Sequence, residues 1–352
     1  MNILEFIQKL LSFFKRKDEV KSLPQPQAIV HKPVEPQDVW VLAVDGGGIK
    51  GLISAYVIEE LDKTLKSKNG DAPLSSYFDL IAGTSTGGLI TLCLTKTNPI
   101  STNDITGLYL HKNGIFFPHP KSFFERLLKD KYSIDGMLKY FDEVFKDDTF
   151  NSLTTNALLM SYDIENSTPF PMDKTSTPSM KLKDAAMATT AAPTYYPPFT
   201  LKTDDKKYCL IDGGVIANNP TLWAYAKAKE LYPNRKRIHV ISIGNFRKKP
   251  TFNQDSGSFS WLDFSKGNLP IQTLYHSASY ENISALAKVF PDLDYIRIEY
   301  HNNKEESVKM DDISPLTLNR LTMMGKAVID ENKSLITNLA DRLISYKKSK
   351  IV

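Results

Sequence analysis

The chain has 352 residues, of which 41% are hydrophobic and 24% charged, and its formal net charge is +4 at pH 7. This composition is typical of a folded globular protein, and no uninterrupted apolar run reaches the roughly 18 residues needed to cross a bilayer. The lysines are scattered, so the basic excess does not indicate a nucleic-acid polymer as partner and only weakly favours an anionic lipid surface.

The two cysteines, Cys93 and Cys209, are too few for a disulfide framework, and each lies in an apolar run. We expect both to be core thiols of a protein in a reducing, cytoplasmic compartment.

Residues 1–20 place Phe, Ile and Leu on one helical face and polar residues on the other, followed by the basic cluster Lys15, Arg16 and Lys17. Two interpretations stay open for this amphipathic helix: it packs on the domain or on a second subunit, as in a homodimer, or it lies in a lipid headgroup layer. The proline-rich residues 21–38 predict a linker. We expect the catalytic domain to occupy residues 39–352, with a helical carboxy-terminal part.

The domain opens with a continuous apolar run at residues 39–44, which is typical of a parallel strand buried on both faces. A glycine loop follows at residues 45–51, then a helix and a second apolar strand at residues 79–82. This βαβ unit predicts an α/β fold with a mainly parallel sheet.

The glycine loop also fits the G-x-G-x-x-G dinucleotide fingerprint, but the polar, lysine-rich stretch 62–71 lacks the second strand and terminal acid that this site requires. The Walker pattern fails because Gly51 follows Lys50. We therefore interpret the N–H groups of Gly46, Gly47 and Gly48 as an anion nest for an oxyanion, with Lys50 adding positive charge.

The second strand runs into Gly83-Thr84-Ser85-Thr86-Gly87, a Gly-x-Ser-x-Gly turn before a helix-like segment. A serine at such a sharp turn needs neighbours without a Cβ atom, which Gly83 and Gly87 provide. Ser85 is the candidate nucleophile.

Further along the chain, residues 105–110 predict a helix, residues 158–163 a buried strand, residues 169–178 a loop and residues 316–347 one long helix. Apolar side chains recur at helical spacing between residues 122 and 150, and they are either core or the lining of an acyl-chain channel. A small-residue helix at 185–192 ends at Pro193, and we expect it to pack closely on the glycine-rich site.

A third turn follows the apolar strand at residues 208–211, where Asp212 leads into Gly213 and Gly214. None of the six histidines stands at a strand-end glycine turn after an acid, as a Ser-Asp-His triad would require. We therefore predict a Ser85-Asp212 dyad in which the carboxylate is the general base.

Four blocks in this order resemble those of the patatin-like phospholipases, and the resemblance covers roughly residues 39–245: Asp-Gly-Gly-Gly-Ile-Lys-Gly at 45–51, Gly-Thr-Ser-Thr-Gly-Gly at 83–88, Ala-Thr-Thr-Ala-Ala-Pro at 188–193 and Asp-Gly-Gly at 212–214. The resemblance implies a three-layer α/β/α sandwich and a lipid acyl hydrolase, of phospholipase A or lysophospholipase type. It also implies Ser85 as nucleophile, Asp212 as base and Gly46, Gly47 and Gly48 as oxyanion hole.

No metal or other cofactor is expected, because the sequence has no His-x-x-x-His, no paired Cys-x-x-Cys and no calcium-loop spacing. The resemblance implies an acyl-lipid substrate, reached at a membrane surface to which the protein binds peripherally. Two alternatives stay open: an effector, secreted in some relatives, whose lipase activity needs a nucleotide or partner, and a catalytically silent interaction protein.

Overall fold

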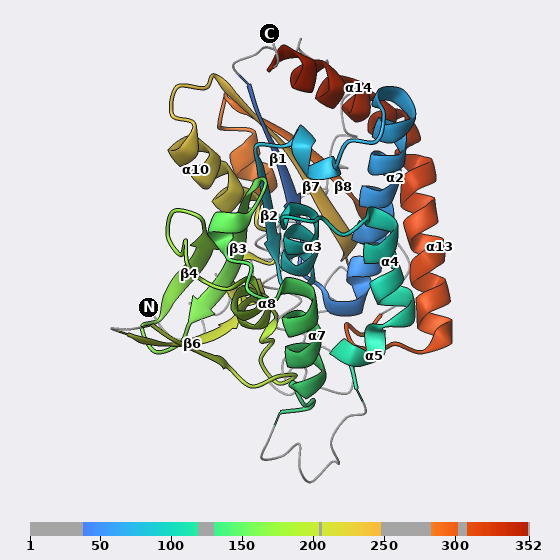
Figure 1. The fold of residues 1–352 in the computed structure, drawn as a ribbon. Helices are drawn as coiled ribbons and strands as arrows, with labels where there is room; N and C mark the ends of the chain where they lie inside the picture. Colours follow the sequence, from blue (N-terminus) through green and yellow to red (C-terminus); the bar gives the residue numbers. More distant parts are fainter. Residues whose placement is uncertain (1–37, 119–129, 204–205, 248–282, 302–307, 351–352) are drawn as a thin grey trace, which may run out of the picture. The chain divides into compact units, whose positions relative to one another are not determined.

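The computed structural model describes residues 38–118, 130–203, 206–247, 283–301 and 308–350. In this part, an eight-stranded sheet has the order β5-β6-β3-β2-β1-β7-β8, with β4 paired to β3 (Figure 1). The strands are β1 (Asp38–Val44), β2 (Leu80–Thr84), β3 (Asn156–Asp163), β4 (Thr168–Asp173), β5 (Phe199–Lys202), β6 (Lys207–Asp212), β7 (Arg237–Arg247) and β8 (Leu293–His301).

The centre of the sheet is parallel. β1 pairs in parallel with both β2 and β7, β2 with β3, and β7 with β8, whereas the pairs β3–β4, β3–β6 and β5–β6 are antiparallel. The mainly parallel sheet expected from the βαβ unit is confirmed.

Helices cover both faces of this sheet (Figure 1). The helices are α2 (Gly51–Asn69), α3 (Thr86–Thr95), α4 (Thr102–His111), α5 (Asn113–Phe116), α7 (Asp135–Phe145), α8 (Leu182–Thr190), α9 (Gly214–Ala217), α10 (Thr221–Leu231), α13 (Pro315–Glu331) and α14 (Lys333–Ser349), with 3₁₀ turns η1 (Gly48–Lys50), η2 (Leu74–Tyr77) and η3 (Phe150–Ser152). None of these helices is both long and apolar enough to cross a membrane.

Strand β1 shows how the layers form. Because successive side chains of a strand point to opposite faces, Trp40, Leu42 and Val44 pack into the core that contains α2, α3 and α14. The alternate residues Val39, Val41 and Ala43 pack with α9 and α10 on the other face. All seven residues of β1 are buried, as the continuous apolar run predicts, and the three-layer α/β/α fold is confirmed.

Other predicted elements are also present. The helix at residues 105–110 is part of α4, the buried strand at 158–163 is part of β3, and the small-residue helix is α8, which ends at Thr190. Cys93 is buried as expected, but Cys209 is only half-buried on β6, next to the sheet edge. The expectation that both thiols are core residues is therefore correct for Cys93 alone.

Two predictions of secondary structure were wrong. Residues 169–178 do not form only a loop, because β4 pairs Pro169 and Pro171 with β3. Proline is compatible with such a strand since β4 pairs with β3 alone, so its other side needs no N–H donor. The long carboxy-terminal helix is two helices, α13 and α14, separated at Asn332, whose side chain donates to the Val328 carbonyl at 2.8 Å.

The amphipathic segment 1–20 and nearly all of the linker 21–38 lie outside the described residues; only Asp38 is described, and it is the first residue of β1 rather than part of the linker. The predicted channel residues before position 130 are outside them as well.

Candidate active site

Ser85 lies at the sharp turn between β2 and α3. Its backbone has φ 54° and ψ −123°, a conformation that L-residues rarely adopt and that is typical of a strained nucleophile turn. The turn is tight: a Cβ atom on Gly83 would lie 2.1 Å from the Gly87 carbonyl oxygen, and one on Gly87 would lie 2.2 Å from that of Val44. Both glycines are therefore required by close backbone approach, as the motif predicts.

Helix α8 helps to hold this turn. The Ser85 N–H donates to Oγ1 of Thr189 at 2.9 Å, and the Thr189 hydroxyl donates to the Met160 carbonyl of β3 at 2.7 Å. The expectation that the small-residue helix packs on the glycine-rich site is confirmed. Thr189 was not predicted to have a role of its own, although it lies in the block Ala-Thr-Thr-Ala-Ala-Pro at 188–193.

Asp212 ends β6 and lies beside Ser85. The two turns are tied together because the Thr84 hydroxyl donates to the Ala217 carbonyl of α9 at 2.6 Å. Asp212 is 5% exposed, and its Oδ1 accepts the Gly214 N–H at 2.7 Å. Gly213 is needed for close packing, since a Cβ atom there would lie 2.4 Å from the Met160 carbonyl oxygen.

The environment of Asp212 favours its neutral form. Burial raises its pKa to about 6, although hydrogen bonds from the Ser85 hydroxyl and the Gly214 N–H favour the carboxylate. A carboxyl group with this pKa is a stronger proton acceptor than an ordinary aspartate and is still mostly ionised at pH 7.

The glycine loop lies directly against the serine. A Cβ atom on Gly46 would lie 3.3 Å from the Ser85 Cβ atom. Gly48 has φ +60°, and a Cβ atom on it would lie 2.2 Å from the Met310 carbonyl oxygen, so a side chain is excluded both by conformation and by space. The Met310 carbonyl also accepts the Ile49 N–H at 2.8 Å, which fixes the far end of the loop.

The three glycines differ in their N–H groups. That of Gly46 donates to the Asn218 carbonyl at 2.9 Å and is not available for an oxyanion. Within the described residues, the N–H groups of Gly47 and Gly48 have no hydrogen-bond partner. Of the three N–H groups in the predicted anion nest, only those of Gly47 and Gly48 are therefore unoccupied within the described residues.

Lys50 ends the short helix η1 and is half-buried. Burial lowers its pKa to about 8, so the ammonium group is still mostly charged at pH 7. Among the described residues no carboxylate forms an ion pair with it. Its charge therefore contributes a positive potential next to the loop.

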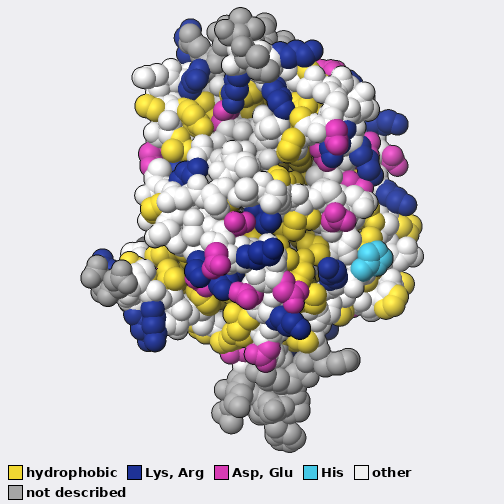
Figure 2. All heavy atoms as spheres, in the orientation of Figure 1, with side chains coloured by type: hydrophobic (Ala, Val, Ile, Leu, Met, Phe, Trp, Pro, Cys, Tyr) yellow, Lys and Arg dark blue, Asp and Glu magenta, His cyan; other side chains and the backbone are white. Residues whose placement is uncertain are grey.

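An apolar pocket with about 840 Å³ of empty space, including its open mouth, begins at Ser85 and Gly48. Leu89 and Cys93 line it from α3, one and two turns beyond Ser85, and α4, α5 and α7 close its other sides. In Figure 2, apolar side chains reach the surface over this region among interspersed acidic and basic ones. The apolar residues of α7, including Phe141, are both core and pocket lining, so the two interpretations of this stretch are compatible.

A polar contact at the border of this pocket joins α3 to α4. The hydroxyl groups of Thr86 and Tyr109 lie 2.5 Å apart, which connects the residue after Ser85 to α4. Tyr109 is the only link of this kind that we see between α4 and the start of α3 in the described residues, and nothing in the spacing of the sequence indicated it. Such a contact depends on how α4 folds back over α3.

The chain is similar to known proteins over most of its length. A family model described as patatin-like phospholipase matches residues 42–225. Patatin-like protein 2 of Arabidopsis thaliana is 30% identical in an alignment that covers 87% of this chain and 86% of the relative. A protein of Solanum tuberosum named probable inactive patatin-3-Kuras 1 is 30% identical over 338 residues, covering 84% of this chain and 87% of the relative.

Among solved structures, the crystal structure of VipD from Legionella pneumophila aligns with 90% of this chain and 67% of that chain, with a TM-score of 0.40 and 12% sequence identity.

Proposed function

The chain belongs to the patatin-like phospholipase family, and on this basis we propose that it is a lipid acyl hydrolase that cleaves fatty-acyl esters through Ser85 and Asp212. The observation that carries the proposal is the position of the dyad: the Ser85 hydroxyl lies close enough to the buried Asp212 to favour its carboxylate form, and Ser85 lines an apolar pocket. Pockets with apolar walls and few polar groups are typical of apolar ligands.

Acylation begins with proton transfer. Asp212 accepts the hydroxyl proton of Ser85 as its Oγ attacks the ester carbonyl, and the acyl chain lies in the apolar pocket. The carbonyl oxygen becomes an oxyanion, which the N–H groups of Gly47 and Gly48 bind. Collapse of this intermediate breaks the ester bond, and the leaving alcohol, a lysolipid when the substrate is a phospholipid, takes the proton from Asp212.

Deacylation repeats the same chemistry with water. Asp212 accepts a proton from water as it attacks the acyl-serine, and the oxyanion is again held by the two N–H groups. Ser85 then takes the proton back from Asp212 as the fatty acid leaves. The positive potential of Lys50 favours negative charge at both stages.

The test is hydrolysis of phospholipid vesicles by the wild type, Ser85→Ala and Asp212→Asn. The rate is measured from the release of fatty acid and lysolipid. We expect both variants to lose at least about 1,000-fold in turnover. Ser76→Ala and Asp147→Asn are matched controls, because both residues are exposed and lie outside the site. Equal turnover by the wild type and the two dyad variants would refute the assignment.

The same assay decides between catalysis and a silent interaction protein, the alternative suggested by the relative named probable inactive. A fluorophosphonate that labels the wild type at Ser85 but leaves Asp212→Asn unlabelled supports an active dyad. A wild type that neither hydrolyses ester nor reacts with this probe supports the silent alternative.

A further inference from the structure

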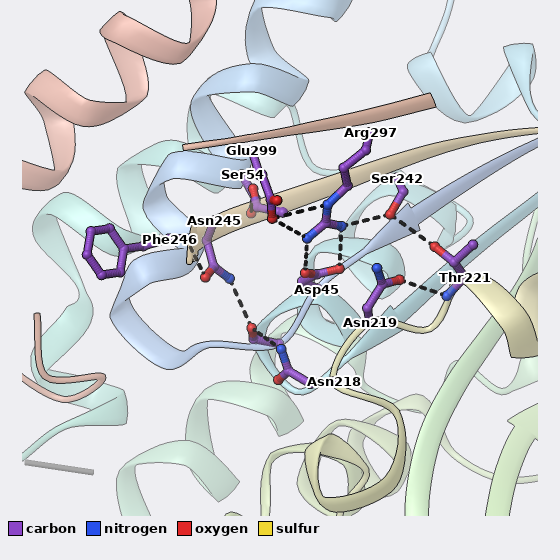
Figure 3. Close-up of polar contacts among 12 residues, drawn as sticks. Asp45, Ser54, Asn218, Asn219, Thr221, Ser242, Asn245, Phe246, Arg297 and Glu299 are labelled. Atoms are coloured by element: carbon purple, nitrogen blue, oxygen red, sulfur yellow. Dashed lines mark hydrogen bonds and ion pairs between the residues drawn. The ribbon is translucent and has the colours of Figure 1, made fainter. Parts of the chain in front are cut away.

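The carbonyl oxygen of Gly46 accepts hydrogen bonds from two side-chain amides. Nδ2 of Asn245 donates to it at 2.9 Å, and Nδ2 of Asn218 donates to it at 3.2 Å (Figure 3). The backbone carbonyl of Asn218 also accepts the Gly46 N–H at 2.9 Å. Gly46 is therefore held at both of its peptide groups, although it needs no side chain of its own.

This arrangement determines where the next N–H group points. A trans peptide is planar, so its C=O and N–H point in opposite directions. Because the Gly46 carbonyl is fixed towards Asn218 and Asn245, the Gly47 N–H is fixed on the opposite side, away from both carboxamides. We propose that Asn218 and Asn245 are positioning residues of the oxyanion hole, an inference that rests on the proposed hydrolase function.

A bulge in β7 brings Asn245 to this position. Ile243 pairs with Ile298 of β8 and Phe246 pairs with Tyr300, so Gly244 and Asn245 together oppose the single residue Glu299. Such an extra residue bends a strand and re-aims its side chains. The Phe246 N–H donates to Oδ1 of Asn245 at 2.7 Å, which leaves Nδ2 as the atom that faces Gly46.

A buried arginine holds the bulge and the loop together. Arg297 on β8 contacts both carboxylate oxygens of Asp45 at 2.8 and 2.5 Å, and it also contacts Glu299 at 2.8 Å and Ser242 at 2.7 Å (Figure 3). A Cβ atom on Gly244 would lie 2.2 Å from Nη2 of Arg297, so the guanidinium passes over the bulge where no side chain blocks it. Asp45 immediately precedes Gly46, so the clamp fixes the start of the loop.

Gly47 is adapted to the same contact. Its φ of 161° is extended backbone that other residues adopt, so conformation does not explain the glycine. A Cβ atom on it would instead lie 2.6 Å from Nδ2 of Asn245. A side chain at this position would displace the carboxamide that orients the peptide.

The experiment removes the side-chain N–H donor of Asn245 without adding a charge. Asn245→Leu has nearly the same shape and no N–H group, and Asn245→Gln keeps the carboxamide on a longer side chain. Asn332→Leu is the matched control, because Asn332 donates to a backbone carbonyl at 2.8 Å between α13 and α14. Each protein is assayed on p-nitrophenyl butyrate, with active sites counted from the burst of p-nitrophenol.

We expect Asn245→Leu to lower kcat per active site by about 10- to 100-fold, a fraction of the loss seen when an oxyanion donor is removed outright. KM should change by less than about twofold, since the contact matters in the transition state and not in substrate binding. A trifluoromethyl ketone, which forms a tetrahedral adduct, should bind more weakly by the same factor as the loss in kcat/KM. Asn245→Gln should recover part of the activity, and Asn332→Leu should match the wild type.

A merely structural role would lower the fraction of active sites and leave kcat per active site unchanged, and that result would overturn the inference. If Asn245→Leu does not fold, Asn245→Gln and Asn218→Leu are compared with the wild type instead. A lower kcat or a lower inhibitor affinity in either variant supports positioning. Unchanged kcat and unchanged inhibitor affinity in both variants would overturn it. A wild type without ester hydrolysis and without fluorophosphonate labelling would instead refute the proposed function, and the positioning role with it.

Discussion

The pKa of Asp212 leads to a pH dependence that an ordinary aspartate would not produce. Burial raises this pKa from 3.8 to about 6. About nine-tenths of Asp212 is then ionised at pH 7 but only about one-tenth at pH 5, whereas a group with pKa near 4 would stay about nine-tenths ionised at pH 5. If Asp212 is the general base, kcat/KM should therefore fall about tenfold between pH 7 and pH 5.

The assay is kcat/KM on p-nitrophenyl butyrate from pH 4.5 to 8.5, with a soluble ester chosen so that the charge of a lipid surface does not enter. Circular dichroism at each pH separates titration from unfolding, and Asp147→Asn serves as the control, because this aspartate is exposed. A profile that stays flat down to pH 4.5 in folded protein would refute the reasoning. A loss of activity as the pH rises through about 8 would be assigned to another group, with Lys50 as the first candidate, because deprotonation removes its positive charge.

Two further predictions concern the stability of the protein and the length of the acyl chain in its substrate. The folded-state pKa of Asp212 lies about 2 units above its ordinary value, so the ionised group destabilises the fold at pH 7 by at most about 3 kcal/mol. Asp212→Asn should therefore raise the urea midpoint at pH 7, and the difference should vanish below about pH 4, where the carboxyl is protonated in both states; an unchanged midpoint at pH 7 would contradict it. Cys93 lines the pocket eight residues beyond Ser85 on α3, about 12 Å along the helix. Cys93→Phe should reduce turnover of palmitoyl esters about tenfold or more and leave butyryl esters within about twofold, whereas equal effects on both would mean that the acyl chain does not extend this far.

The nucleophile, the base and the glycine loop were predictable because each is a local signal. Ser85 and Asp212 both follow an apolar strand and precede glycine, so a few neighbouring residues indicate the turn. The parallel strands β1 and β2 bring the glycine loop and Ser85 to one edge of the sheet. Asp212 reaches the same edge differently, because β6 is antiparallel to β3 and pairs Asp212 with Ser161 near the end of β3. The four blocks also occur in the same order as in the patatin-like phospholipases, which supported their assignment to one site.

The positioning residues could not be predicted in the same way. Asn245 acts through a bulge that depends on the register between β7 and β8, and Arg297 reaches Asp45 across the whole width of β7. No spacing along the chain encodes either contact. The break between α13 and α14 was missed for a related reason: apolar residues continue at helical spacing through Asn332, and the change in helix direction depends on the surfaces against which each helix packs.

The site contains several features that lower stability, and their position explains how the fold tolerates them. Ser85 has a positive φ, and Asp212 is buried with a raised pKa. Both are held by hydrogen bonds: Thr189 of α8 accepts the Ser85 N–H, and the Gly214 N–H donates to Asp212. Strain of this kind persists only when the surroundings determine the geometry more strongly than the strained group resists it. Weakening the supporting contacts should therefore relax the site before the protein unfolds. Activity should be lost at a lower denaturant concentration than the one at which the sheet unfolds.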